Sequence, residues 1–335
     1  MLPVSRVFSF AGLLVLLLLA GCQNPTLSQI GAFGNSVSSL ATNASNGYEM
    51  IDTATVIEQI YHVASDPSQV PSADTFKGVF SVPVAASPQD TTAPVVLPAL
   101  TPDQEKWSGI QGRLNMLSAM GKYANALQIL ATTDYRSGID TASQNLDSGL
   151  NTLSADYTKI SGKPSKISKN DIAILSSAVD AIGAAIVEEK RRAAIKAIII
   201  KTDPTIQDAA KLLEEEFGPK ADGIPADVQQ KLTLAANFLG NAYIAEKDQP
   251  GATFAKRYQM LIDMQNMYQL AAATPNYFGD VARGAKAMAQ AHAALVQAVQ
   301  QDKFTSSEIV NNIGDLVSYA QSVQAFYKKF SSNGK

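Results

Sequence analysis

The sequence has few of the side chains from which most metal sites and many catalytic sites are built. Its 335 residues include one cysteine and two histidines. A single cysteine excludes both a disulfide within the chain and a zinc site made of several thiolates. His62 and His292 cannot form an HExxH zinc motif, and neither follows a glutamate by three residues as in di-iron helical bundles. We therefore predict no metal, no cofactor and no enzymatic activity.

Charge is also scarce, and its two signs nearly balance. The chain carries 27 basic and 30 acidic residues, a formal net charge of −3 at pH 7. Because nucleic-acid binding requires a strongly positive surface, this balance argues against a nucleic-acid partner. GxSxG, Walker A and GxGxxG sequences are absent. The 46% hydrophobic content nevertheless predicts a globular protein with a sizeable core.

The N-terminus has the organisation of a secretory signal. Arg6 is the only charge before the apolar run at residues 8–20, and Gln23 follows that run closely. A transmembrane helix needs about 20 apolar residues, so the run is too short to cross a bilayer comfortably. A basic start followed by a short apolar stretch is typical of a cleaved signal peptide. We expect residues 1–21 to be removed.

The end of this run, Leu19-Ala20-Gly21-Cys22, resembles the lipobox of bacterial lipoprotein signal peptides. The resemblance implies that the Cys22 thiol receives a diacylglyceryl group, that the chain is cut before it and that the new amine is acylated by palmitate-type chains. Two or three acyl chains anchor a protein durably. Gln23, where aspartate would favour retention at the inner membrane, implies an outer-membrane lipoprotein of the bacterial cell envelope. Its periplasmic or surface-facing orientation stays open.

Most of the mature chain shows helical periodicity, with apolar residues at steps of three and four. This pattern predicts an all-α fold, an elongated antiparallel multi-helix bundle with coiled-coil-like stripes. Seven prolines interrupt it between residues 66 and 102, where we predict an extended, proline-rich insertion. The expected organisation is a lipid-anchored helical segment (22–65), the proline-rich loop (66–102) and a bundle (103–335) that forms one domain with residues 27–65.

Prolines and charges set the expected helix boundaries within the bundle. Asp203-Pro204 and Thr274-Pro275 each predict the start of a new helix, because proline inside a helix removes a hydrogen bond and clashes with the preceding turn. A helix from Ser168 to about residue 200 contains the charged run 188–192. Its charges either form solvated pairs or turn one side chain into the bundle, which makes Glu189 and Arg192 candidate partner residues.

Two further features are candidates for a binding role. Tyr258, Met264 and Tyr268 belong to an aromatic and methionine band, which is either core filling or the wall of a pocket for a small apolar ligand. His292 lies within an apolar stripe, either as a core histidine with satisfied hydrogen bonds or as a pH-sensitive or ligand-contacting group.

Three functional hypotheses follow from these features. The leading one is a lipid-anchored, non-enzymatic scaffold or adaptor for other envelope components, with a protein partner in the envelope. The first alternative is a binding module for a small apolar ligand. The second is a membrane-active protein of pore-forming type, suggested by the apolar stretch 172–187. Whether the bundle self-associates is open.

Overall fold

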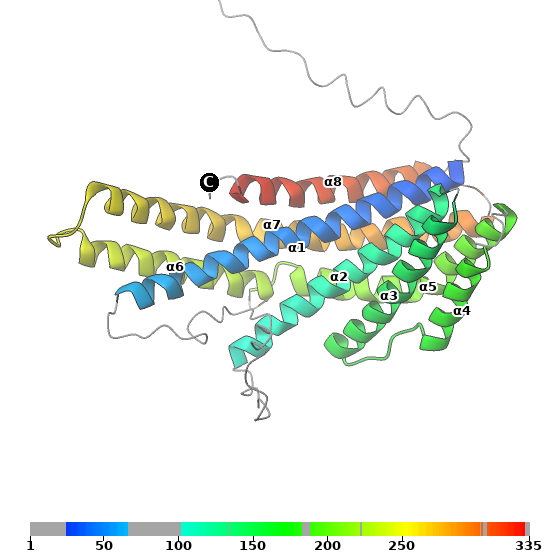
Figure 1. Ribbon diagram of the computed structural model, residues 1–335, viewed down its shortest axis with the longest axis horizontal. Coiled ribbons are helices and arrows are strands. Elements are labelled where there is room, and N and C mark those ends of the chain that lie inside the picture. The colour runs from blue at the N-terminus through cyan, green and yellow to red at the C-terminus, as the bar shows by residue number, and fades with distance from the viewer. Residues whose placement is uncertain are drawn as a thin grey trace, which may run out of the picture.

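The protein is all-α, as the periodicity predicts. The computed structural model describes residues 25–65, 102–133, 135–182, 188–221, 223–301, 303 and 307–331. Cys22 and residues 66–101 lie outside this set. The described residues form eight helices and no strand (Figure 1): α1 (Pro25–Ser65), α2 (Pro102–Thr132), α3 (Arg136–Ser161), α4 (Lys169–Asp180), α5 (Glu188–Phe217), α6 (Ile224–Glu246), α7 (Phe254–Gln301) and α8 (Ser307–Ser331).

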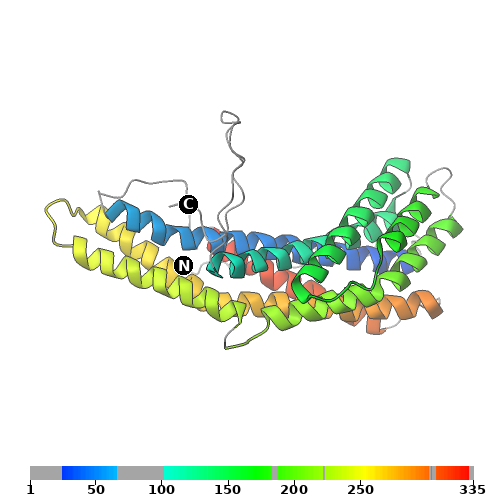
Figure 2. The same cartoon turned by 90° about the horizontal axis from the view of Figure 1, so that it is seen from below.

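The helices form an elongated bundle around two long ones. α7 runs along nearly the whole length, and α5 and α6 follow each other along it in the opposite direction (Figures 1 and 2). α1 starts at the end where α7 finishes and packs against α2, α6, α7 and α8. Consecutive helices are mostly antiparallel neighbours, which is the geometry expected when short connections join amphipathic helices.

α1 is one continuous helix in spite of its glycines, because two of them allow close packing. A Cβ atom at Gly34 would lie 2.5 Å from the backbone oxygen of Ala124 on α2. A Cβ atom at Gly47 would lie 2.6 Å from the ring of Tyr277 on α7. The helix-propensity cost of glycine, about 1 kcal/mol, is therefore offset by contacts that a larger residue would prevent.

The connection between α3 and α4 follows its sequence signals closely. α3 ends at Gly162, which adopts a left-handed φ of 67° that glycine tolerates without strain. α4 begins with a capping box in which Ser168 and Asp171 exchange hydrogen bonds: the Asp171 amide donates to Ser168 Oγ (3.1 Å) and the Ser168 amide donates to Asp171 Oδ2 (3.0 Å).

The predicted helix from Ser168 to residue 200 is wrong, because two helices occupy this stretch. α4 ends at Asp180 and continues into a turn in which the Ile182 amide donates to the Val179 carbonyl. The described part of α5 runs from Glu188 to Phe217. The stretch 172–187 therefore does not lie within one helix, and no helix among the described residues has the length and hydropathy needed to cross a membrane.

Both proline boundaries are also wrong, because Pro204 lies inside α5 and Pro275 lies inside α7. The buried face of each helix continues across its proline: α5 buries Thr202 and Thr205, and α7 buries residues on both sides of Pro275. Pro204 itself is exposed, so the carbonyl that loses its partner one turn earlier can be hydrated. Packing of a continuous apolar face thus outweighs the local penalty of proline.

The bundle has two parts that differ in how they are packed. We call residues 237–268, the distal half of α6, its loop and the start of α7, the arm, and the remainder the body (Figure 2). Buried residues from all eight helices join one hydrophobic cluster. Leu239 and Met260, buried toward the tip of the arm, are not part of that cluster. The arm is formed by α6 and α7, and the C-terminal part of α1 lies along it (Figure 1).

Candidate functional site

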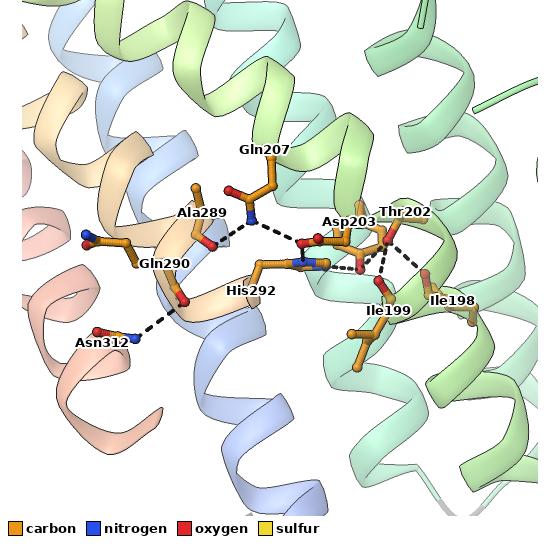
Figure 3. A network of polar contacts seen from close by, with 10 residues as sticks. Ile198, Ile199, Thr202, Asp203, Gln207, Ala289, Gln290, His292 and Asn312 are labelled. Carbon is orange, nitrogen blue, oxygen red and sulfur yellow. Dashed lines mark hydrogen bonds and ion pairs between the residues drawn. The ribbon is translucent and has the colours of Figure 1, made fainter. Parts of the chain in front are cut away.

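A chain of hydrogen bonds joins α2, α5 and α7 inside the body (Figure 3). His292 Nδ1 lies 2.9 Å from Asp203 Oδ1, and His292 Nε2 lies 2.7 Å from the Tyr123 hydroxyl. Thr202 Oγ1 lies 2.9 Å from the same hydroxyl. Gln207 Nε2 donates to Asp203 Oδ1 at 3.0 Å. We call these five residues the His292 network.

The network lies beside the proline of α5 and extends to neighbouring helices. Thr202 and Asp203 immediately precede Pro204, and Gln207 follows Asp203 by one helical turn. The amide nitrogen of Gln207 also donates to the carbonyl of Ala289 on α7, at 2.9 Å. The Gln207 side chain therefore ties α5 to α7 directly, next to the contact of Asp203 with His292 between the same two helices.

Every polar atom of the imidazole has a partner in either protonation state. Nδ1–H donates to the Asp203 carboxylate. In the neutral form, Nε2 accepts from Tyr123 and Thr202 donates to Tyr123. In the charged form, Nε2–H donates to Tyr123, which can donate to Thr202, because the Thr202 hydroxyl has a second acceptor in the Ile198 carbonyl at 2.8 Å. The chain of hydroxyls can reverse its direction without losing a hydrogen bond.

The surroundings fix the charges of the other two titratable members. Burial raises the pKa of Asp203, but hydrogen bonds from His292 and Gln207 outweigh it, and the pKa lies below its ordinary value. Burial raises the pKa of Tyr123 far above its ordinary value, although the Thr202 bond lowers it in part. Asp203 is therefore an anion and Tyr123 a neutral hydroxyl at physiological pH.

This constellation is closed to solvent at its centre. The His292 side chain is 0% exposed, and the ring of Phe33 on α1 lies 5.8 Å from it between centroids. Asp203, with 26% of its side chain exposed, and the partly buried Gln207 reach the surface at one edge of the network. An acid or base must come within hydrogen-bond reach of its substrate, and a covered imidazole does not. The geometry makes the network a polar clamp between helices, in line with the core interpretation of His292.

The second candidate site is on the surface of the arm. Phe254, Tyr258, Leu261 and Tyr268 lie on one face of α7 and are exposed, with Phe254 at 75% and Tyr258 at 55%. Ile244 of α6 is exposed as well. We call these five residues the arm strip. Contiguous exposed apolar side chains of this size are typical of interaction surfaces.

The structure separates the sequence-predicted site residues instead of gathering them. Tyr258 and Tyr268 face outward on the arm, while Met264 turns toward α6, where its Sδ would lie 3.3 Å from a Cβ at Gly240. His292 lies 24 residues beyond Tyr268 on the same helix, about 36 Å away. The tyrosines are open to solvent and do not enclose a small ligand.

The charged run at the start of α5 contains both solvated charge pairs and one side chain that turns into the bundle. Glu189 and Arg192 are exposed, and Arg192 Nε pairs with Glu188 Oε1 at 3.2 Å. Arg191 is instead buried and donates from Nη2 to the Thr133 carbonyl just after the end of α2, at 2.7 Å. The buried member is thus a residue that was not among the candidates. Its cation lies at the negative end of the α2 dipole.

A third feature is a groove of about 440 Å³ between α1, α2 and α3. Its lining comes from α1, α2 and α3 and consists of hydroxyl and amide side chains, one lysine, one alanine and one glycine: Ser38, Ala41, Thr42, Ser45, Asn46, Ser118, Gly121, Lys122, Asn125 and Asn145. The described residues contain no group of three or more histidine, cysteine or acidic side chains placed to hold a metal ion.

Sequence reasoning missed the network because its members are far apart in the chain. Tyr123 and His292 are separated by 169 residues, and His292 and Asp203 by 89. One local signal was present: Thr202 and Asp203 are polar residues at a point where the helical stripe continues. No protein-family model matches this chain, and no curated protein or solved structure matches it either.

Proposed function

We propose that the protein is a lipid-anchored scaffold of the bacterial cell envelope that presents an interaction surface at a distance from the membrane. The observation that carries the proposal is the position of the arm strip. The lipobox cysteine, Cys22, precedes α1 by three residues, and α1 starts at the end of the bundle opposite the tip of the arm (Figures 1 and 2). An anchor at Cys22 would therefore lie at the opposite end of the bundle from the arm strip.

The dimensions support a spacer. α1 has 41 residues and α7 has 48, which correspond to about 60 Å and 70 Å at 1.5 Å per residue. A protein anchored by acyl chains on Cys22 would hold the arm strip about this far from the outer-membrane surface. The strip carries large aromatic side chains, which dominate the energetics of protein interfaces.

A non-enzymatic role is supported by the His292 network. Its histidine and tyrosine are covered by packed side chains, so the one triad-like constellation we identify connects helices and has no open face for a substrate. A rigid body with an exposed arm suits an adaptor, because the partner then meets a preformed surface.

The anchor is tested by the Cys22→Ser variant, expressed as the full precursor in bacteria. We expect the wild-type protein to sediment with outer membranes and the variant to be released by mild washing. Retention of the variant in the membrane after alkaline washing would overturn the proposal.

The interaction surface is tested by a photo-crosslinking amino acid placed at Tyr258, with the same substitution at Asn311, an exposed position on α8, as control. We expect a discrete protein adduct from position 258 that is at least tenfold weaker from position 311. The adduct must be the same species in repeated preparations and must disappear when Leu261 is replaced by glutamate.

A further inference from the structure

The first part of α1 carries no charged side chain, although one side of it faces solvent. No aspartate, glutamate, lysine or arginine occurs between Pro25 and Tyr48, and Lys122 is the one such residue of α2 between Leu114 and Thr133. The outward face of a helix in a bundle normally carries charges. Here serine, threonine and asparagine take their place, and they line the groove between α1, α2 and α3.

Close packing of α1 on α2 forms the bottom of this groove. Ala41 and Gly121 are the buried members of the lining, and a Cβ atom at Gly121 would lie 3.0 Å from the Cβ of Ala41. Ser38 Oγ donates to the Gly121 carbonyl at 3.1 Å. At the α3 edge, Asn145 Nδ2 donates to Asn125 Oδ1 at 2.9 Å. Hydrogen bonds therefore join the three helices around the groove, which is formed before any ligand binds.

Several side chains of the lining keep their hydrogen-bonding capacity for a ligand. Within the part of the chain that the structure describes, Thr42, Ser45, Asn46 and Ser118 make no side-chain hydrogen bond, and Lys122 makes no ion pair. Hydroxyl and amide groups both donate and accept, whereas the lysine ammonium only donates. The matching ligand has donors and acceptors along its length and a negative charge at one point.

The negative charge of such a ligand belongs at the Lys122 end of the groove. Asp140 and Asp147 of α3 are exposed and lie at least about 140° around that helix from its one residue in the lining. Glu49, the first acidic residue of α1, lies eleven residues beyond Ser38, about 16 Å along the helix. Because Ser38 bonds to the residue before Lys122, Glu49 lies at the opposite end of the groove.

The lining argues against other kinds of ligand. It contains no aromatic side chain, no arginine and no aliphatic side chain larger than alanine. Protein interfaces draw most of their binding energy from aromatic residues and arginine, and pockets for apolar ligands are lined by hydrophobic residues. The volume of about 440 Å³ is within the range of small-ligand sites, roughly 300 to 1,000 Å³. The groove therefore suits a small hydrophilic ligand.

We propose that this groove binds an anionic saccharide, with sugar hydroxyls bonded to Thr42, Ser45, Asn46 and Ser118 and a carboxylate or phosphate paired with Lys122. The groove is separate from the arm strip, which stays open to a protein partner. In a bacterial envelope, sugars of this chemistry occur in the cell-wall glycan, which carries carboxylates, and in lipopolysaccharide, which carries phosphates. The choice of these two sources follows from the proposed location, whereas the groove chemistry does not depend on the lipid anchor.

Isothermal titration calorimetry of the full-length chain, purified in detergent as it is expressed in bacteria, tests the site with three probes. The carboxylate probe is the disaccharide of N-acetylglucosamine and N-acetylmuramic acid. The phosphate probe is the phosphorylated diglucosamine of lipopolysaccharide, freed of its acyl chains. The neutral probe is diacetylchitobiose. We expect one anionic probe to bind with a dissociation constant below about 1 mM, at least tenfold more tightly than the neutral probe.

Matched substitutions assign the binding to the groove. Lys122→Glu should weaken binding at least tenfold, and Lys196→Glu, at an exposed lysine of α5, less than twofold. Ser118→Phe fills the groove and should also weaken binding at least tenfold, whereas Ser177→Phe, at an exposed serine of α4, should not. Lys122→Arg keeps the cation and should stay within about threefold of wild type. Circular dichroism unchanged from wild type confirms that each variant is folded.

Each outcome supports or overturns the site. Binding of the carboxylate probe or of the phosphate probe supports it and identifies the source of the ligand. Equal binding of the neutral probe, equal binding by Lys122→Glu and wild type, or no binding of either anionic probe at several millimolar would overturn the proposal. Because the titration does not require membrane attachment, failure of the groove variants is a separate result from failure of the anchor in Cys22→Ser.

Discussion

The body and the arm are built from the same kind of helix but are stabilised in different ways. In the body, glycines bring backbones together and a buried polar network joins three helices. In the arm, Leu239 and Met260 are buried between helices, while the aromatic residues of the arm strip face solvent. The same apolar periodicity therefore serves internal packing in one region and external contact in the other. Substitutions should have large effects on stability in the body and small effects in the arm.

The largest effect is expected for His292→Ala. The substitution leaves a buried cavity and removes the partner of both Asp203 and Tyr123, so the free energy of unfolding should fall by about 3 to 5 kcal/mol. Urea denaturation followed by circular dichroism measures this. A matched pair of hydroxyl deletions refines the comparison: Tyr123→Phe should cost about 1 to 3 kcal/mol, and the exposed Tyr268→Phe under about 0.5 kcal/mol. Equal losses in the free energy of unfolding for Tyr123→Phe and Tyr268→Phe would contradict the distinction between body and arm.

A second comparison uses one substitution at two helical glycines. Gly34→Ala forces a methyl group against the Ala124 backbone and should destabilise by about 1 to 3 kcal/mol, despite the higher helix propensity of alanine. At Gly240 the added methyl meets only the flexible end of Met264, so Gly240→Ala should be neutral or slightly stabilising. Thermal unfolding of both variants measures these two effects on stability. A melting temperature for Gly34→Ala at or above wild type would refute the packing argument.

A third prediction concerns pH and the part of α1 that leads toward the arm. Burial, with the nearby charge of Glu49, raises the pKa of Asp52 from 3.8 to about 7. The folded state then holds this proton more tightly than the unfolded chain, so stability falls as pH rises from about 4 to 7. Asp52→Asn should stabilise by about 1 to 2 kcal/mol at pH 8.5 and leave stability nearly unchanged at pH 4.

Asp171 serves as a control, because its pKa is shifted in the opposite direction from that of Asp52. Hydrogen bonds from Ser168 lower its pKa to about 2. Asp171→Asn should therefore destabilise at neutral pH, and its effect should fade as pH falls below 4 toward 2. Urea midpoints at three pH values measure both variants. A gain for Asp52→Asn that is the same at pH 4 and pH 8.5 would show that the carboxyl does not titrate near neutrality.

The smallest effect on stability is expected for the arm strip. The double variant Tyr258→Ser, Leu261→Gln exchanges exposed apolar side chains for polar ones and should change the free energy of unfolding by less than about 0.5 kcal/mol. Urea denaturation measures this change, and a loss of more than about 1 kcal/mol would show that these side chains contribute to the core.

The contrast also explains what the sequence could predict. Helix positions and stripes such as Ile139 to Tyr157 follow from local spacing, and the cap at Ser168 follows from local hydrogen bonding. The failures are tertiary. Pro204 and Pro275 stay within helices because packing on both sides holds the helix together. Asp203 has the sequence context of a helix cap, yet its partner is a histidine on another helix.

For the candidate sites too, local spacing predicts some features, and others depend on how the helices pack. An aromatic band on α7 is visible in the sequence, but periodicity cannot tell which side of the helix the rest of the bundle leaves uncovered. Tyr258 and Tyr268 can be picked out from the sequence, but how they lie relative to Ile244 of α6 depends on the register between the two helices. The sequence does not single out Arg191 from its charged neighbours. Consecutive residues point in different directions around a helix, and the sequence alone does not say which of them faces the core.

The continuity of α7 has a mechanical consequence. If the molecule is held at the start of α1 and loaded at the tip of the arm, the force acts along the axes of antiparallel helices. Such a load must slide α1 past α7 over their full contact instead of peeling the helices apart one turn at a time. The contact of Gly47 with Tyr277 opposes that sliding directly. The Gly34 contact holds α1 to α2, which the His292 network ties to α7, and so opposes it through a third helix. Under tension, the resistance of the bundle is therefore shared among contacts along its whole length.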